Sequence, residues 1–364
     1  MKEAGDLVAL SVPFTLGIGA GAFITRFIGY NQEYIAAGAA IAICAILLGR
    51  LISGRDGRIP FPILFLALGL FCAISSDLLP ASSRSGGVFT LASSCSSRLR
   101  GLIASVPFSR ESTNALISAL LTGDRSGLNS DLTSVFRDSG ASHILALSGL
   151  HLGVIYVIFT KLLSIAGNSV LAVRMRSIVI ILFSGFYTLM TGAGPSIVRA
   201  FLFILINEAG GSAPERKRSP VRTLLAALTI QLALKPSVLS TLGFQLSYLA
   251  MTGIILLYPK LSSWYPDDAS LNIFSPARKI WNSTALTISC QVFTAPLVWI
   301  KFHTFPKYFI ITNLIALPMT SVIMAVSVGT LFLYGTGWCP ALLLKADELL
   351  VQNLLFSLEC ISGM

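Results

Sequence analysis

Residues 143–151 read His143-Ile-Leu-Ala-Leu-Ser-Gly-Leu-His151, and a largely apolar run continues from them to about residue 166. The run does not alternate polar and apolar side chains, so it predicts a membrane helix and not a barrel strand. Its length is close to the ~20 residues that a helix needs to cross a bilayer. The polar residues at its start raise a question of function, because polar groups inside membranes usually face protein or water.

Runs of this kind recur along the chain. Of its 364 residues, 54% are hydrophobic and 12% are charged, whereas soluble domains carry roughly 25% charged residues. We predict an all-α membrane protein, a polytopic helical bundle with about ten transmembrane helices, some of them broken or short. The candidate spans are 7–26, 34–50, 59–79, 142–166, 174–192, 195–208, 221–235, 239–258, 283–301 and 308–334. Residues 191–195 break one run, and Pro318 is expected to interrupt the last one.

The net charge is +10, from 26 Lys and Arg against 16 Asp and Glu. Basic residues gather in alternate loops, such as 50–58 and 209–222, and the positive-inside rule places such loops in the cytoplasm. We therefore expect both termini in the cytoplasm and residues 80–141 outside. A more specific alternative explanation of the same positive charge is that the protein acts on a polyanionic substrate.

The pattern divides the chain into four segments. Residues 1–80 predict a three-helix membrane segment, and 81–141 an external linker with amphipathic interfacial helices, flexible over its Ser- and Gly-rich part at 81–97. Residues 142–335 predict a second helical membrane domain, and 336–364 an interfacial C-terminal helix. The six cysteines form no CxxC pair. We therefore predict no metal cluster, no disulfide framework and no cofactor.

Several polar or small residues lie inside the predicted spans and are candidates for function. On a single helix, Ser148 and His151 would share a face, which makes a hydrolase dyad conceivable, yet no Asp or Glu is present to orient it. His143 and His151 would lie ~12 Å apart on that helix, too far to ligate one metal. Tight helix packing and the lining of a polar path both remain open for this run.

Arg199 lies in the short span and has two explanations. Its guanidinium could extend to the membrane interface, or it could face an aqueous cavity and bind an anionic substrate. Later spans each carry an amide or hydroxyl, namely Gln245, Ser247, Gln291 and Asn313. Intramembrane carboxylates are almost absent, which argues against a proton or cation pump.

The order of these motifs resembles the competence domain of the ComEC family, an inner-membrane DNA-uptake channel. The matching motifs are Leu120-Leu-Thr-Gly-Asp124, Phe136 through Gly140, His143 through His151, Pro195-Ser-Ile-Val-Arg-Ala200, Gly243-Phe-Gln-Leu-Ser247, Gln291 through Pro296 and Asn313-Leu-Ile-Ala-Leu-Pro318. The resemblance covers about residues 99–335. It implies that residues 142–335 form a competence-type channel domain in the bacterial cytoplasmic (inner) membrane.

The resemblance also implies that single-stranded DNA passes through this domain into the cytoplasm during natural transformation. The channel or DNA-path candidates are then His143, Ser148, Gly149, His151, Arg199, Gln245, Ser247, Gln291 and Asn313. The partners implied are single-stranded DNA, the lipid bilayer, a DNA receptor, a separate nuclease and a cytoplasmic helicase.

The chain departs from the family at two places. Residues 80–98 leave no room for the family's OB-type domain, and the chain reaches Met364 without the motif of a metallo-β-lactamase-like domain. We therefore expect no nuclease, and no enzyme, in this chain. Two alternatives stay open: a permease for another anionic solute on the same scaffold, and a membrane-embedded hydrolase that uses Ser148 and His151.

Overall fold

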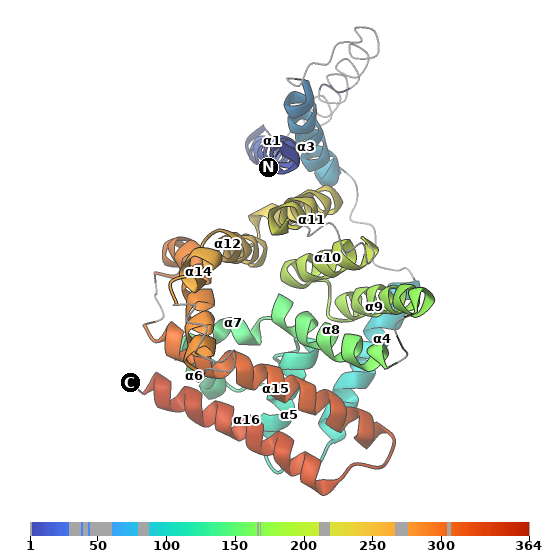
Figure 1. Cartoon of the computed structure of the whole chain (residues 1–364), viewed down its shortest axis with the longest axis vertical. Coiled ribbons are helices and arrows are strands. Elements are labelled where there is room, and N and C mark those ends of the chain that lie inside the picture. Colours follow the sequence, from blue (N-terminus) through green and yellow to red (C-terminus); the bar gives the residue numbers. More distant parts are fainter. Residues whose placement is uncertain are drawn as a thin grey trace. The chain divides into compact units, whose positions relative to one another are not determined.

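Helices form all the regular structure in the described part of the chain, as predicted (Figure 1). The computed structural model describes residues 2–28, 60–78, 87–165, 169–210, 219–265, 276–303 and 307–363, with the single residues 38, 43 and 167. The predicted span 34–50 lies outside the described residues, apart from two positions.

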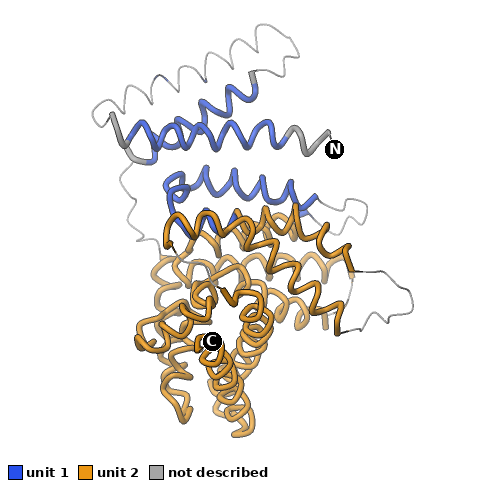
Figure 2. The backbone as a smooth tube through the Cα atoms, turned by 90° about the vertical axis from the view of Figure 1, so that its left-hand side faces the viewer, with its two compact units in different colours: residues 1–84, 210–248 blue, residues 85–209, 249–364 orange. Residues whose placement is uncertain are grey.

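The chain divides into two compact units, each made of two stretches of sequence (Figure 2). Unit 1 comprises residues 1–84 and 210–248, and unit 2 comprises residues 85–209 and 249–364. The helix α12 (Leu242–Leu256) runs across the division. These units cut across the four segments expected from sequence, whose boundaries stay a prediction.

Unit 1 is built on a close helix pair. Its elements are α1 (Lys2–Ile28), α3 (Pro60–Leu78), α11 (Pro220–Leu234) and the 3-10 helix η1 (Pro236–Ser240). A Cβ atom at Gly17 would overlap the Leu66 carbonyl oxygen, and one at Gly69 would overlap that of Phe14. The two backbones of α1 and α3 therefore approach each other at positions that only glycine allows.

Unit 2 holds the larger hydrophobic core. Its helices are α4 (Gly87–Ser105), α5 (Glu111–Thr122), α6 (Ser130–Asp138), α7 (Ser142–Leu145), α8 (Gly149–Ser164), α9 (Val170–Met190), α10 (Pro195–Ala209), α13 (Tyr258–Ser262), α14 (Pro276–Phe302), α15 (Phe309–Gly335) and α16 (Ala341–Ser362). The core joins side chains of α5 and α8 to those of α15 and α16. Helix α15 contacts α4, α5, α8 and α16 and is therefore central to this core.

Local sequence explains where several of these helices begin and end. The Asn129 side chain accepts a hydrogen bond from Leu132 N at 3.0 Å and starts α6, and the Ser169 hydroxyl does the same for α9. Gly123 ends α5 in the left-handed region at φ 78°. Small polar N-caps and a C-terminal glycine satisfy the free backbone groups at helix ends.

Four helices are long and apolar enough to cross a membrane by length and composition, in α1, α9, α14 and α15. Four shorter apolar helices lie at Phe61–Ser76, Gly149–Ser164, Pro220–Leu234 and Leu242–Leu256. The membrane character predicted from composition is therefore supported, whereas four long helices do not amount to the ten predicted spans.

Two predicted helix breaks have different outcomes. The break at residues 191–195 is present, because α9 ends at Met190 and α10 begins at Pro195. The break at Pro318 is wrong, because α15 runs without interruption from Phe309 to Gly335. A proline is tolerated inside a membrane helix when neighbouring groups satisfy the freed backbone carbonyl.

The structure also differs from the sequence expectation in the region 81–141. Residues from Gly87 onward form α4, where a flexible linker was expected. Eight of the twelve residues of α5 are buried, so α5 is a core helix of unit 2 and does not lie on a surface. Helices of the same unit cover the face that amphipathicity alone assigns to the membrane interface.

Candidate functional site at the junction of α7 and α8

The opening sequence motif does not form one helix. After α7 the chain is extended at Ala146 (φ −77°, ψ 122°) and at Ser148 (φ −119°, ψ 172°), and α8 begins at Gly149. The expectation that His143, Ser148 and His151 share one helix is therefore wrong. The ~12 Å separation derived from a single helix no longer applies, because the chain bends between the two histidines.

Ser148 and His151 cap the N-terminus of α8. The Ser148 hydroxyl accepts a hydrogen bond from Leu150 N at 3.2 Å, and His151 Nδ1 accepts one from Ser148 N at 3.1 Å. This reciprocal arrangement is a capping box, with histidine in the place usually held by Glu or Gln. Two backbone N–H groups at the start of the helix are satisfied in this way.

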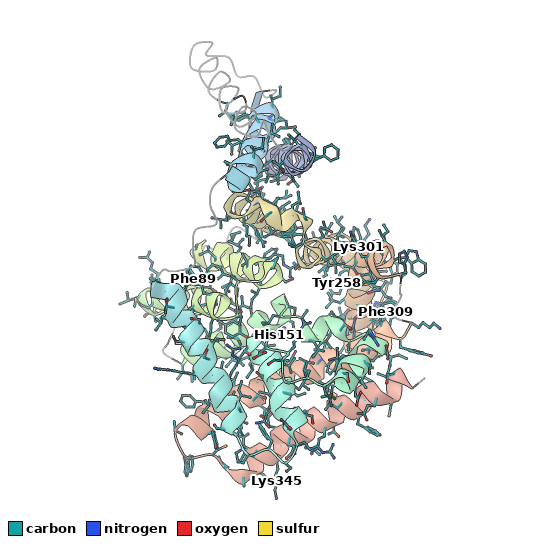
Figure 3. All side chains as sticks on the ribbon, turned by 180° about the vertical axis from the view of Figure 1, so that it is seen from behind. Phe89, His151, Tyr258, Lys301, Phe309 and Lys345 are labelled. Atoms are coloured by element: carbon teal, nitrogen blue, oxygen red, sulfur yellow. The ribbon has the colours of Figure 1, made fainter. Side chains whose placement is uncertain are left out.

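His151 is fully buried within unit 2 (Figure 3). Because Nδ1 accepts from a backbone N–H, the proton of the neutral ring lies on Nε2. Nε2 is buried and makes no hydrogen bond; the Ile144 carbonyl lies nearby but outside hydrogen-bond geometry. A buried donor of this kind is costly unless a partner reaches it.

Arg199 packs directly over the start of α8. A Cβ atom at Gly149 would lie 3.1 Å from Arg199 Nη2 and 3.4 Å from the Ala200 Cβ. Arg199 is only 8% exposed, and its charge acts on the Cys290 thiol of α14. The guanidinium therefore lies inside unit 2, which argues against its extension to the membrane interface, and the aqueous-cavity explanation stays a prediction.

His143 and Asn313 lie on the other side of the junction. His143 Nδ1 is 3.2 Å from the Gly140 carbonyl oxygen. His143 keeps an exposed surface, although protein atoms surround most of it. Asn313 on α15 is within interacting distance of the His143 ring, yet its Oδ1 is buried without a hydrogen bond. Two buried polar atoms, His151 Nε2 and Asn313 Oδ1, thus lack partners around one junction.

The remaining candidates do not all join this cluster. Gln291 follows Cys290 on α14, on the segment that Arg199 approaches. Gln245 belongs to unit 1, where its amide donates a 2.9 Å hydrogen bond to the Leu239 carbonyl and so ties α12 to η1. Ser247 is buried in unit 1 as well. Six of the nine predicted residues therefore meet at the α7–α8 junction: His143, Ser148, Gly149, His151, Arg199 and Asn313.

Neighbouring charged residues hold the junction in place. Arg125 Nε donates a 2.9 Å hydrogen bond to the Leu145 carbonyl at the end of α7. Asp124 accepts from Ser126 N at 3.0 Å and pairs with Arg100 at 2.9 Å. The Ser126 hydrogen bond, assisted by Arg100, lowers the pKa of Asp124 to about 2. The Asp124 carboxyl group is therefore ionised at neutral pH, and its contacts with Ser126 and Arg100 hold the loop.

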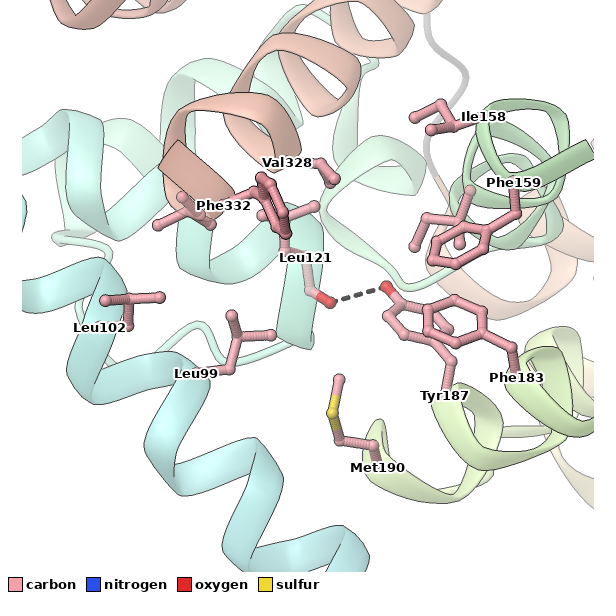
Figure 4. Close-up of a pocket in the computed structure, with 12 residues that line it drawn as sticks. Leu99, Leu102, Leu121, Ile158, Phe159, Phe183, Tyr187, Met190, Val328 and Phe332 are labelled. Carbon is pink, nitrogen blue, oxygen red and sulfur yellow. Dashed lines mark hydrogen bonds between the residues drawn. The ribbon is translucent and has the colours of Figure 1, made fainter. Parts of the chain in front are cut away.

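A separate cavity of about 270 Å³ is lined in part by α8 (Figure 4). Its lining is apolar and comes from α4, α5, α8, α9 and α15, with the Phe159 and Phe183 rings stacked at 3.9 Å. None of the nine predicted residues lines it. The hydroxyl of Tyr187, which lines the cavity, is already donated to the Leu121 carbonyl, so the cavity does not suit a phosphate-bearing substrate.

Sequence reasoning missed a set of polar side chains that bind backbone carbonyls outside their own helix. Tyr187 donates to Leu121 O at 2.7 Å, and Thr312 donates to Ser139 O at 2.7 Å. Asn114 donates to the Ile103 and Val106 carbonyls, at 2.7 and 3.0 Å. No sequence spacing predicts such contacts, because the accepting carbonyls lie outside the helix that carries the donor.

Two carboxylates were also missed. Glu208 on α10 accepts from Tyr156 of α8 and Ser177 of α9, which ties three helices together. Asp347 is fully buried on α16. The spacing of residues along α16 could have predicted this burial, because Asp347 shares a helix face with the buried Val351, Leu354 and Leu358. Among the described residues, no group of three or more His, Cys, Asp or Glu side chains could hold a metal ion.

Comparison with known proteins places the chain in a family. The family described as "Competence protein" matches residues 120–364. The chain is 27% identical over 213 residues to ComE operon protein 3 of Bacillus subtilis (strain 168), a match of 57% of this chain and 24% of that protein. It is 24% identical over 219 residues to the Uncharacterized protein YcaI of Escherichia coli (strain K12), a match of 58% of this chain and 28% of that protein.

The chain thus matches about a quarter of the length of either relative. No solved structure matches it. The family match covers the whole α7–α8 junction and both helices that carry Arg199 and Asn313. On this evidence, the resemblance to the ComEC family is confirmed and the chain belongs to the competence protein family.

Proposed function

We propose that this chain is a component of the inner-membrane path through which single-stranded DNA enters the cytoplasm during natural transformation. The observation that carries the proposal is the meeting of Arg199 with the N-terminus of α8, inside a chain of the competence family. A guanidinium beside the positive end of a helix dipole makes a locally positive region, which attracts phosphate oxygens. His151 and Asn313 add polar groups within the same junction.

The sparse charge of this junction suits passage better than tight binding. A nucleic acid strand carries one charge per nucleotide, and each cation that binds a phosphate adds affinity and slows release. One buried Arg with amides and imidazoles around it gives a strand weak contacts that it can exchange as it moves. The junction therefore favours a transport role over an enzymatic one.

The test uses a matched pair of glycines on one helix. Gly149→Ala forces the Arg199 guanidinium to shift, whereas Gly153→Ala, one turn later on α8, meets no atom within 4 Å. We expect entry of labelled DNA to fall in Gly149→Ala and to stay at the wild-type level in Gly153→Ala. Equal behaviour of the two variants at equal membrane abundance would contradict the proposal.

Replacement of Arg199 gives the larger effect. Arg199→Ala is expected to reduce DNA entry at least ~10-fold, the equivalent of one lost charge-assisted contact. Arg199→Lys keeps the charge and is expected to recover part of the entry. Exposed Arg98 on α4 provides the control, because Arg98→Ala removes one cation outside the junction. Membrane insertion and abundance are measured for every variant.

The proposal includes a topology of about ten spans with both termini in the cytoplasm. The four long and four shorter apolar helices account for eight of these spans, and α10 and residues 34–50 supply the others. In a cysteine-free background, a cysteine at position 218 should react with a membrane-impermeant reagent only from inside, and one at position 90 only from outside. The opposite labelling would overturn the orientation. We also propose a DNA receptor, a separate nuclease and a cytoplasmic helicase as partners.

Two alternatives are tested by the same set of variants. A permease for another anionic solute would need Arg199 but would leave transformation normal in a strain that lacks this chain. The hydrolase alternative gains one observation, the 3.0 Å distance between Ser148 Oγ and His151 Nδ1. Ser148→Asn preserves the N-cap and removes the nucleophile. Normal DNA entry in Ser148→Asn would exclude the hydrolase.

A further inference from the structure

A buried carboxyl group lies between the last two helices of the chain. Asp347 on α16 has no exposed surface and faces α15 from the apolar side of its helix. No step of the proposed DNA path uses it. An acid in such a place is costly, and its ionised form requires either a cation or several hydrogen-bond donors.

The hydrogen bonds around Asp347 are incomplete for a carboxylate. Ser327 of α15 donates to Oδ1 at 2.9 Å, and Oδ2 is buried without a partner. The Thr330 hydroxyl lies beside the same carboxyl group. Its proton is already donated to the Val326 carbonyl at 3.0 Å, so its oxygen is free to accept. An ionised Asp347 would therefore place two acceptors, Oδ2 and Thr330 Oγ1, beside each other.

No cation compensates a negative charge at this position. Neither ion pair of the described residues includes Asp347, and α15 carries no Lys, Arg, Asp or Glu. The ionisable side chains on the packed elements are Tyr334 on α15, Glu111 on α5, Asp131, Arg137 and Asp138 on α6, and Lys345, Glu348, Glu359 and Cys360 on α16 itself. Tyr334 donates to the Ser105 carbonyl and Glu348 accepts from Ser109, and the others are exposed.

We propose that Asp347, Ser327 and Thr330 form a proton-binding site within the contact of α15 and α16. A proton taken from water onto Oδ2 makes that atom a donor to Thr330 Oγ1, which in turn donates to Val326. Ser327 continues to donate to Oδ1, so the protonated acid satisfies every polar atom in the group. Burial independently raises the pKa of Asp347 to about 6.

The consequence is a helix contact whose strength depends on pH. Since the folded pKa lies above that of a free Asp, the folded protein binds more protons than the unfolded chain between pH ~4 and ~6. Stability from this site is complete below that window and is lost as the pH rises through about 6. Above it, the carboxylate weakens the packing of α16 on α15. The site does not depend on the substrate proposed above.

The experiment follows the proton itself. The purified full chain in liposomes is titrated between pH ~4.5 and ~8 while infrared difference spectra record the carbonyl band of protonated carboxylic acids. We expect a band that disappears with a midpoint near pH 6 in the wild type and that is absent from Asp347→Asn. Glu348→Gln is the control, since it removes the adjacent acid of α16 and should keep the band.

A second variant keeps the test valid even if Asp347→Asn does not fold. Ser327→Ala removes the donor that stabilises the ionised form, so its midpoint should move to higher pH. In thermal unfolding, the wild type should lose stability as the pH rises from ~4 through about 6, and Asp347→Asn should not. A wild-type midpoint at or below that of a free Asp, or an unchanged band in Asp347→Asn, would overturn the proposal.

Discussion

Units 1 and 2 differ in the contacts that their cores use, although one close glycine contact, that of Gly253 with the Ser289 carbonyl, also lies in unit 2. In unit 1, α1 and α3 approach so closely that backbone meets backbone at Gly17 and Gly69. In unit 2, long-range contacts run from hydroxyl and amide side chains to backbone carbonyls, as in Tyr187 with Leu121 and Thr312 with Ser139. A glycine contact requires only that the two backbones fit closely together. A carbonyl contact also requires that a hydroxyl or amide donor lies at one particular position in the folded protein.

The difference bears on where function lies. A glycine contact leaves no polar group behind, so unit 1 suits a role as support. Unit 2 contains bends, buried polar atoms and the junction of α7 and α8, where partners are still lacking for His151 Nε2 and Asn313 Oδ1. Such unsatisfied groups destabilise a resting structure and are available for a substrate.

The largest expected effect tests the close packing of unit 1. Gly17→Ala would place a Cβ against the Leu66 carbonyl oxygen, which cannot move unless the two helices separate. We expect a loss of about 3 kcal/mol in the free energy of unfolding, the upper range for an overpacked site. Chemical unfolding of the purified protein, followed by the fluorescence of a probe on α3, measures it.

Gly19→Ala is the matched control for this change. Gly19 lies on the same helix, and an added Cβ meets nothing within 4 Å. Its substitution should be neutral or stabilise by up to ~1 kcal/mol, because alanine favours a helix over glycine. A Gly17→Ala protein as stable as Gly19→Ala would show that the α1–α3 contact does not depend on glycine.

The next effect tests the carbonyl contacts of unit 2. Tyr187→Phe removes the donor to the Leu121 carbonyl, which is buried and would lose its partner. We expect a loss of ~1–3 kcal/mol in the free energy of unfolding. Tyr334→Phe removes a comparable bond to the Ser105 carbonyl in an exposed place, where water replaces it. Thermal unfolding of both variants should show the smaller loss in Tyr334→Phe.

The sequence predicts well those features that depend on local composition. The expected span 59–79 corresponds to α3 at Pro60–Leu78, and the break at residues 191–195 follows from its glycines and proline. The family was also accessible from sequence, because each of its motifs is a contiguous run of residues. These features require no knowledge of what packs against each segment.

Features that depend on neighbours could not be predicted in the same way. Residues 146–148 are apolar enough to continue a helix, yet the chain bends there. The bend coincides with the capping of α8 by Ser148 and the hydrogen bond from Arg125 to Leu145. At Pro318 the opposite occurs, because the proline predicts a helix break and α15 continues through it. Tertiary contacts override the local preference in both places.

The smallest expected effect concerns the charged loop beside the junction in unit 2. Asp124 and Arg100 are partly exposed, so their ion pair contributes less than about 1 kcal/mol. Because the pKa of Asp124 is lowered to about 2, its contribution is present at neutral pH and is lost as the pH falls from about 4 to about 2. Asp124→Asn should therefore be slightly less stable than the wild type at pH 7, and the two should converge in acid. If the wild type and Asp124→Asn still differ in free energy of unfolding at the acid end, Asp124 acts through its shape and the turn at Ser126. Unit 2 would then rely on its neutral carbonyl contacts alone.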